Sequence, residues 1–209
     1  MTRAVFLDVL GTLLELEPPW VSLRDRVPAG ISDERLIAAL RTEMEYYRKH
    51  AHEGRDEASL ADLRERCARL VSRELDIELT VEELLDAIRF DPYSDTVPAL
   101  GELRARGLRV LVVSNWDVSL PRVLARCGIA GLIDATVTSA EVGARKPDPA
   151  IFLAALELAG SSADEALHVG DTAEEDVTGA RAAGIRALLI DRGGGGGDIS
   201  SLEEIVEHL

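Results

Sequence analysis

From residue 92 onward the chain alternates short apolar runs with helical segments, and this alternation restricts the fold more than any other feature. The runs, rich in apolar and β-branched residues, are 108–113, 135–138, 166–169 and 186–190. Runs of this kind between helices are typical of parallel strands that are covered on both faces. Repeated strand–helix units therefore predict a parallel sheet with right-handed crossovers. A similar run near the start of the chain, 5–7, is expected to add a strand to this sheet.

The stretch between that first strand and residue 92 has a different pattern. Apolar residues recur at helical spacing over 36–47, 60–71 and 81–88, and a capping box, Thr80 to Glu83, begins the third stripe. No strand pattern is found there. We therefore expect an α/β protein with a Rossmann-like parallel sheet core, residues 1–15 and 93–209, and an inserted all-helical cap domain, residues 16–92.

Two aspartates in the second half of the chain are expected to begin helices. Asp117 precedes a helical segment that ends at Gly128, and Asp148 precedes Pro149, a residue favoured at the first helical position. A further helix is expected over 174–183, because Gly184 follows it directly.

Charge and composition restrict the partners that the protein can have. The 209 residues include 38 acidic and 23 basic side chains, a formal net charge of −15. Because nucleic acids and anionic membranes bind basic surfaces, neither is expected as a partner. No apolar run approaches the roughly 18 residues of a membrane span, and the first residues lack a signal-peptide pattern. We expect a cytoplasmic protein in which Cys67 and Cys127 are reduced; the oligomeric state stays undetermined.

Residues capable of chemistry follow the predicted strands. Asp8 ends the first strand, Ser114 and Asn115 end the second, and Asp171 follows the strand at 166–169. In open α/β sheets, ligands bind beyond the carboxyl ends of the strands, so these side chains are expected to lie at one edge of the sheet.

The same edge is expected to bind a metal. Asp176 comes soon after Asp171, and with Asp8 it makes three carboxylates that would repel one another without a cation. Oxygen ligands of this type suit Mg²⁺, which also recruits phosphate groups. Lys146 lies between the second and fourth strands and can supply a positive charge of the protein's own.

Four segments together resemble the motifs of one known superfamily. Residues 8–13, 113–115, 146–147 and 170–176 are similar to the four motifs of the haloacid-dehalogenase-like hydrolases. The order of the segments and the helical stretch after the first resemble the subgroup with a helical cap between its first and second motifs. The resemblance extends over nearly the whole chain.

This resemblance implies a role for each matching residue. Asp8 would be the nucleophile that becomes an aspartyl-phosphate, Ser114 would hydrogen-bond the phosphoryl group, and Lys146 would neutralise it. Mg²⁺ would be held by Asp8, Asp171, Asp176 and the backbone carbonyl of Leu10. The residues expected to contact substrate are Thr12, Asn115 and Trp116.

Leu10 departs from the pattern of the superfamily. Its phosphatases usually carry a second aspartate two residues after the nucleophile, where it serves as general acid and base. Leucine cannot transfer a proton, and loss of such a group typically costs about 10²- to 10⁴-fold in rate. The resemblance therefore implies a Mg²⁺-dependent phosphatase that is slow or limited to good leaving groups, acting on a small phosphorylated or otherwise anionic metabolite. His50, His52 or Glu53 could supply the missing group, although these residues are also typical of a solvated helix end.

Three other functions fit parts of the sequence. A 2-haloacid dehalogenase needs no acid at position 10, but Asp171 and Asp176 would repel its anionic substrate. A phosphonate carbon–phosphorus hydrolase would use a cap lysine, for which Lys49 is the candidate. A non-catalytic binding protein of the same fold has no use for the clustered charges of the site.

Overall fold

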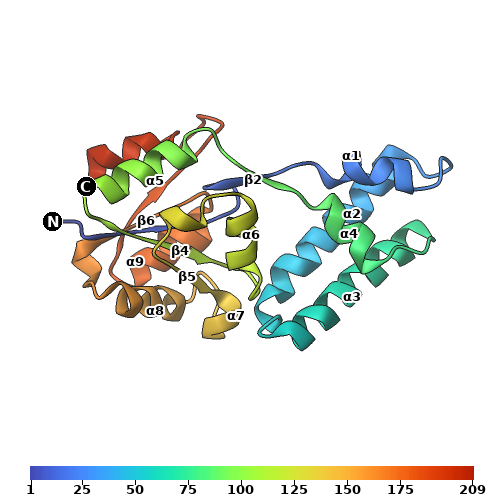
Figure 1. Cartoon of the computed structure of the whole chain (residues 1–209), viewed down its shortest axis with the longest axis horizontal. Helices are drawn as coiled ribbons and strands as arrows, with labels where there is room; N and C mark the ends of the chain where they lie inside the picture. The colour runs from blue at the N-terminus through green and yellow to red at the C-terminus, as the bar shows by residue number, and fades with distance from the viewer.

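The computed structural model describes all 209 residues and contains a parallel sheet beside a group of helices (Figure 1). The five strands lie in the order β5-β4-β1-β6-β7, and every neighbouring pair is parallel. Their bounds are β1 Ala4–Leu7, β4 Arg109–Ser114, β5 Ala135–Thr138, β6 Ala166–Gly170 and β7 Arg186–Leu189. The predicted α/β fold with a parallel sheet is confirmed.

Strand β1 lies in the middle of the sheet, and its side chains pack alternately into two separate hydrophobic cores. Val5 and Leu7 pack on one face with α5 (Thr96–Ala105), α6 (Leu120–Arg126) and the C-terminal 3₁₀ segment Leu202–His208. Ala4 and Phe6 pack on the other face with α8 (Pro149–Ala159) and α9 (Gly179–Ala182). Helices on both faces explain why these strands are apolar without alternation.

The helix-start predictions have different outcomes. The Asp148 carboxylate accepts from the Ala150 backbone N–H and Pro149 begins α8, as predicted. Asp117 does not begin α6, which starts at Leu120; its carboxylate instead accepts from Ser119 N–H and from the Tyr47 hydroxyl. The helix expected over 174–183 is divided into a π-helical segment, Ala173–Thr178, and the short helix α9.

The helical insertion, α1 to α4, packs around a third core and lies on the side of the sheet away from both termini (Figure 1). Its helices are α1 Pro19–Leu23, α2 Asp33–His50, α3 Glu57–Leu75 and α4 Val81–Ala87, with short 3₁₀ segments Arg24–Arg26 and Ala51–Glu53. The capping box at Thr80 and Glu83 that begins α4 was predicted correctly. Even the longest helices, α2 and α3, are amphipathic, and none of the helices has the length and apolar character needed to cross a bilayer.

Two short strands connect the helical insertion to the sheet. β2 (Leu14–Leu16) pairs antiparallel with β3 (Phe90–Pro92), so the chain leaves and returns through one two-stranded ribbon. The expectation that no strand lies between 16 and 92 is wrong at both ends of that range. Strands of three residues are too short to show alternation, and a proline such as Pro92 usually indicates a break.

Helix α9 packs against the segment that carries Lys146, and a pair of glycine variants tests this packing. A Cβ at Gly179 would lie 2.8 Å from Phe152 Cε2 and 2.9 Å from Pro147 Cα. We expect Gly179→Ala to lower the free energy of unfolding by about 1–3 kcal/mol because the contact is overpacked. Gly101→Ala, in α5 with no atom within 4 Å of the added Cβ, should raise it by about 0.5–1 kcal/mol. Urea unfolding followed by circular dichroism measures both; equal stability of Gly179→Ala and the natural chain would contradict the packing.

Candidate active site

Asp8 and Lys146 form a buried ion pair at the carboxyl ends of the central strands. Asp8 follows β1 directly and is 7% exposed, while Lys146 precedes α8 and is 2% exposed. The Lys146 ammonium donates to Asp8 Oδ1 at 2.6 Å, and the Ser114 hydroxyl, at the end of β4, donates to the same oxygen at 3.0 Å. Three segments distant in the sequence thus converge on one carboxylate oxygen.

Lys146 also pairs with a second carboxylate, that of Asp176. The two groups are 2.5 Å apart, and Asp176, only 1% exposed, also accepts from Thr172 N–H. The fully buried His168 on β6 lies 2.9 Å from the same carboxylate, a contact that the sequence did not indicate. Burial by itself would lower the pKa of Lys146, but the charges of Asp176 and Asp8 outweigh it and raise that pKa. Lys146 therefore remains a cation.

One ammonium cannot compensate both carboxylates equally. Burial raises the pKa of Asp176, but Lys146 and His168 outweigh this and hold it well below its ordinary range. For Asp8, burial outweighs the attraction of Lys146, and its pKa is raised. The central group is therefore an ionised Asp176 bound to Lys146, with Asp8 sharing the same ammonium.

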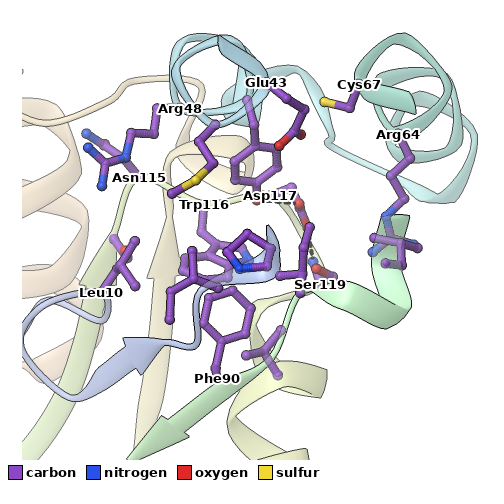
Figure 2. A pocket seen from close by; sticks show the side chains of 18 of the residues that line it. Leu10, Glu43, Arg48, Arg64, Cys67, Phe90, Asn115, Trp116, Asp117 and Ser119 are labelled. Carbon is purple, nitrogen blue, oxygen red and sulfur yellow. Dashed lines mark hydrogen bonds between the residues drawn. The ribbon is translucent and has the colours of Figure 1, made fainter. Parts of the chain in front are cut away.

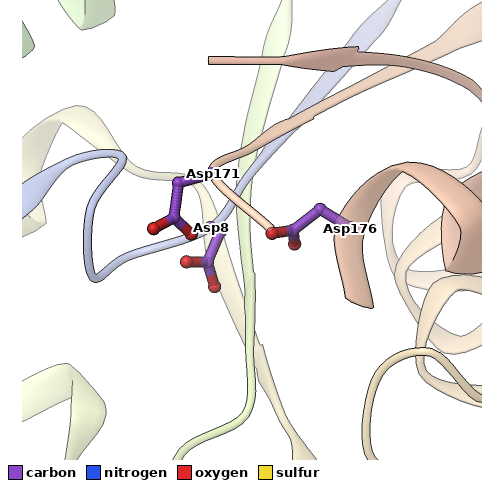
Figure 3. A group of neighbouring side chains, drawn as sticks. All are labelled: Asp8, Asp171 and Asp176. Atoms are coloured by element: carbon purple, nitrogen blue, oxygen red, sulfur yellow. The ribbon is translucent and has the colours of Figure 1, made fainter. Parts of the chain in front are cut away.

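Asp171 completes a cluster of three carboxylates (Figure 3). One oxygen each of Asp8, Asp171 and Asp176 lies within 4.8 Å of the others. Partial burial, together with the negative charges of Asp8 and Asp176, raises the pKa of Asp171 to about 6. Hard oxygen donors that repel one another in this way fit a divalent cation such as Mg²⁺. The cluster therefore fits a magnesium site.

Asn115 holds the backbone of Lys146 in place. Its side-chain oxygen accepts from Lys146 N–H at 2.7 Å, and its amide donates to the Lys146 carbonyl at 3.1 Å. The amide also donates to Glu175, which forms an ion pair with Arg145. Asn115 also lines the cavity described next.

A cavity of about 570 Å³ lies between the strand ends and the helical insertion (Figure 2). Asp8, Ser114, Asp171 and Trp116 line it from the sheet. The Trp116 ring packs against Phe90 with centroids 5.3 Å apart. Thr12 is not brought to this cavity: its side chain is fully buried elsewhere, and its hydroxyl has no hydrogen-bond partner.

Leu10 presents an apolar side chain to the same cavity (Figure 2). The three residues considered as substitutes for an acid at this position do not line it. His50 Nδ1 and Glu53 Oε1 are 2.6 Å apart in a pair of their own, and Glu53 also accepts from Arg66. Lys49 is exposed and also lies outside the cavity lining. The structure thus brings neither the proposed acids nor the proposed amine to the site.

The helical insertion contributes an acid that the sequence analysis did not consider. Glu43 on α2 lines the cavity and is only 4% exposed. Burial raises its pKa, and a hydrogen bond with the Cys67 thiol opposes that effect only in part. Glu43 lies three residues after Leu40 and four before Tyr47, so its inward position could be found from the helical stripe.

A parallel sheet that gathers a lysine and three aspartates at its strand ends, with a helical insertion after the first strand, defines a class of hydrolases. The family described as haloacid dehalogenase-like hydrolase matches residues 2–184. The chain therefore belongs to the haloacid dehalogenase-like hydrolase family, as its motifs predicted.

Parts of the chain are similar to individual phosphatases. The chain is 41% identical over 106 residues to a phosphoserine phosphatase of Thermus thermophilus, covering 50% of this chain and 43% of that protein. It is 38% identical over 103 residues to a glyceraldehyde 3-phosphate phosphatase of Methanopyrus kandleri, 49% of this chain and 44% of that protein. The matches thus span less than half the length of these curated relatives.

Several solved structures resemble the whole chain. A HAD phosphatase from Thermococcus onnurineus aligns with a TM-score of 0.71 and 27% identity, covering 99% of this chain and 97% of that one. The L-2-haloacid dehalogenase of Xanthobacter autotrophicus aligns with a TM-score of 0.74 and 22% identity, covering 99% and 98%. At that lower identity the second likeness shows the fold alone.

The burial of Glu43 leads to a pH-dependent prediction. A folded pKa above the ordinary 4.5 means that folded chains retain this proton better than unfolded ones, so the stability due to this group falls as pH rises above 4.5. Glu43→Met, of similar length, removes the group and should be more stable than the natural chain by about 1–3 kcal/mol at pH 8. The difference should shrink at pH 4.5. Urea unfolding at both pH values measures it.

The matched control is Glu45→Met, an exposed position on the same helix. It should change stability by no more than about 0.5 kcal/mol at either pH. If Glu43→Met were less stable than the natural chain at pH 8, the Glu43 carboxylate would have a stabilising partner in the folded protein, which would contradict the prediction.

Proposed function

We propose that the protein is a Mg²⁺-dependent phosphatase that acts on small phosphorylated metabolites through an aspartyl-phosphate on Asp8. The observation that carries the proposal is the Asp8 carboxylate held by Lys146 beside Asp171 and Asp176. Phosphatases among the relatives, near 40% identity, support it. In this proposal residues 1–15 and 93–209 are the catalytic core, and residues 16–92 are the cap that selects substrate.

The proposed reaction has two displacements. The Asp8 carboxylate attacks phosphorus, the bond to the leaving oxygen breaks, and the phosphoryl group is transferred to Asp8. Water then attacks phosphorus, releasing inorganic phosphate and restoring the carboxylate. Ser114 donates a hydrogen bond toward the transferred group, and Lys146 offsets its negative charge. Asn115 acts by positioning Lys146, and Trp116 forms part of the wall that faces substrate.

The metal would be held by Asp8, Asp171 and the backbone carbonyl of Leu10, with Asp176 in support. When bound, Mg²⁺ offsets the charge between an anionic nucleophile and an anionic phosphate. Thr12 is left out of the proposed substrate contacts because its side chain does not line the cavity.

A dehalogenase is the second candidate, and the apolar Leu10 side chain in the cavity favours it. In that reaction Asp8 would attack a carbon atom and displace halide, which needs no acid. The Asp171 carboxylate on the cavity wall disfavours it, because it would repel an anionic haloacid. A phosphonate hydrolase has no support, since Lys49 is not in the cavity lining.

The test of this function is hydrolysis of 4-nitrophenyl phosphate with and without Mg²⁺. We expect turnover only with Mg²⁺, and a loss of at least about 10³-fold in Asp8→Asn, which removes the nucleophile. Calorimetry should show weaker Mg²⁺ binding by Asp171→Asn. Release of halide from 2-chloropropionate, without turnover of any phosphate ester, would establish the dehalogenase instead.

Leu10 gives a second prediction. Because no acid protonates the leaving oxygen, aryl and acyl phosphates should react much faster than sugar phosphates. The same lack slows attack of water on the aspartyl-phosphate, so a burst of product should precede a slow steady state. Leu10→Asp should raise turnover of alkyl phosphates by about 10- to 10³-fold, measured by phosphate release. Equal rates on alkyl and aryl esters, no burst and no gain in the variant would refute this role of Leu10.

A further inference from the structure

The cavity has two chemically different regions. At the strand ends its lining is charged and polar, with Asp8, Ser114 and Asp171. Toward the helical insertion the lining is mainly apolar. The apolar residues there are Leu16, Pro19, Leu40, Met44, Val81, Leu84, Leu85, Ile88 and Phe90. Trp116 faces them from the sheet, and the polar residues on the insertion side are Glu43, Tyr47, Arg48 and Arg64. A phosphate ester bound with phosphorus at Asp8 would place its leaving group against this apolar wall.

The wall selects against polyols. Hydroxyl groups of a sugar would lose water here and find few hydrogen-bond partners among aliphatic and aromatic side chains. The tilted pair of Phe90 and Trp116 offers ring surfaces to an apolar or aromatic group (Figure 2). The chemistry of the wall therefore fits a leaving group with a substantial apolar part.

Glu43 interrupts this apolar region. It lies on α2 between Leu40 and Met44, and Figure 2 shows it with Cys67 on the side of the cavity formed by the helical insertion. The Cys67 thiol is its hydrogen-bonding neighbour, and none of the ion pairs of the structure includes it. Glutamate is rarely buried so completely unless a cation pairs with it. The missing partner can come from a ligand in the cavity.

The charged groups at the rim differ from Glu43. Arg48, Arg64, Arg122 and Arg126 also line the cavity; Arg64 is half-buried and the other three are exposed to solvent, and none of the four forms an ion pair with Glu43. Arg122 is already paired with Glu57, and Arg145 with Glu175. Exposed guanidinium groups are solvated and need no partner, whereas the buried Glu43 carboxylate does.

We propose that the cavity selects phosphate monoesters whose leaving group has an apolar body and a protonated amine that pairs with Glu43. This inference rests on the proposed phosphatase function, with phosphorus placed at Asp8. Glu43 acts as a specificity-determining residue: it takes no part in bond breaking and recognises the far end of the leaving group.

The test uses four phosphate esters. Three are aryl esters with matched leaving oxygens: 4-(2-aminoethyl)phenyl, 4-ethylphenyl and 4-(2-carboxyethyl)phenyl phosphate; the fourth is glycerol 1-phosphate. We expect kcat/KM with Mg²⁺ to be at least about tenfold higher for the amine than for the ethyl compound. The acid and the glycerol ester should be the poorest substrates. In Glu43→Gln the ratio of kcat/KM for the amine to that for the ethyl compound should fall to about one.

Controls separate this inference from the function on which it rests. Glu45→Gln, exposed on the same helix, should keep the amine preference. Competitive inhibition of the natural chain by tyramine, stronger than by 4-ethylphenol, gives the same information without a variant. If the aryl esters are hydrolysed without amine preference, or the acid is preferred, the role of Glu43 is overturned and the phosphatase stands. If neither these esters nor 4-nitrophenyl phosphate react, the phosphatase function itself fails.

Discussion

The buried ammonium of Lys146 is the group on which the arrangement of the site depends. It lies between Asp8 and Asp176, and removing one member of such a buried pair typically costs about 3–5 kcal/mol. Three parallel strands and the loop before α8 bring these groups together, and the Asn115 side chain holds the lysine backbone from both sides. Without the Lys146 ammonium, the three aspartates at this edge of the sheet would have no positive charge beside them.

The distribution of charge explains how an acidic protein could bind an anionic ligand. The chain has a formal net charge of −15, so attraction of a phosphate must be local. Lys146 is largely engaged by Asp176, and the remaining negative charge faces the cavity at Asp171. A divalent cation at that point reverses the local sign, which makes metal occupancy and ligand binding interdependent in the proposed function.

The sheet and the strand-end cluster could be predicted from the sequence, because apolar runs identify parallel strands and topology places their ends together. Asp8, Ser114 and Asp171 follow from that rule alone. The position of Thr12 could not be predicted, since it depends on how one residue is turned within a loop. Glu43 was missed because a polar residue in an amphipathic helix is normally assigned to the exposed face. β2 and β3 are too short to carry a pattern.

The ribbon of β2 and β3 has a consequence for how this protein can change over evolutionary time. The chain leaves the sheet through Leu14–Leu16 and returns through Phe90–Pro92, and the two strands are paired. Everything between them is joined covalently to the sheet at one place, and its other contacts, such as Tyr47 with Asp117 and Glu57 with Arg122, are made outside the five strands. Its length and sequence can therefore diverge, or be exchanged for another unit, without altering the register of the parallel sheet. The residues at the strand ends and the residues of the helical insertion that line the cavity can therefore change independently of one another during evolution.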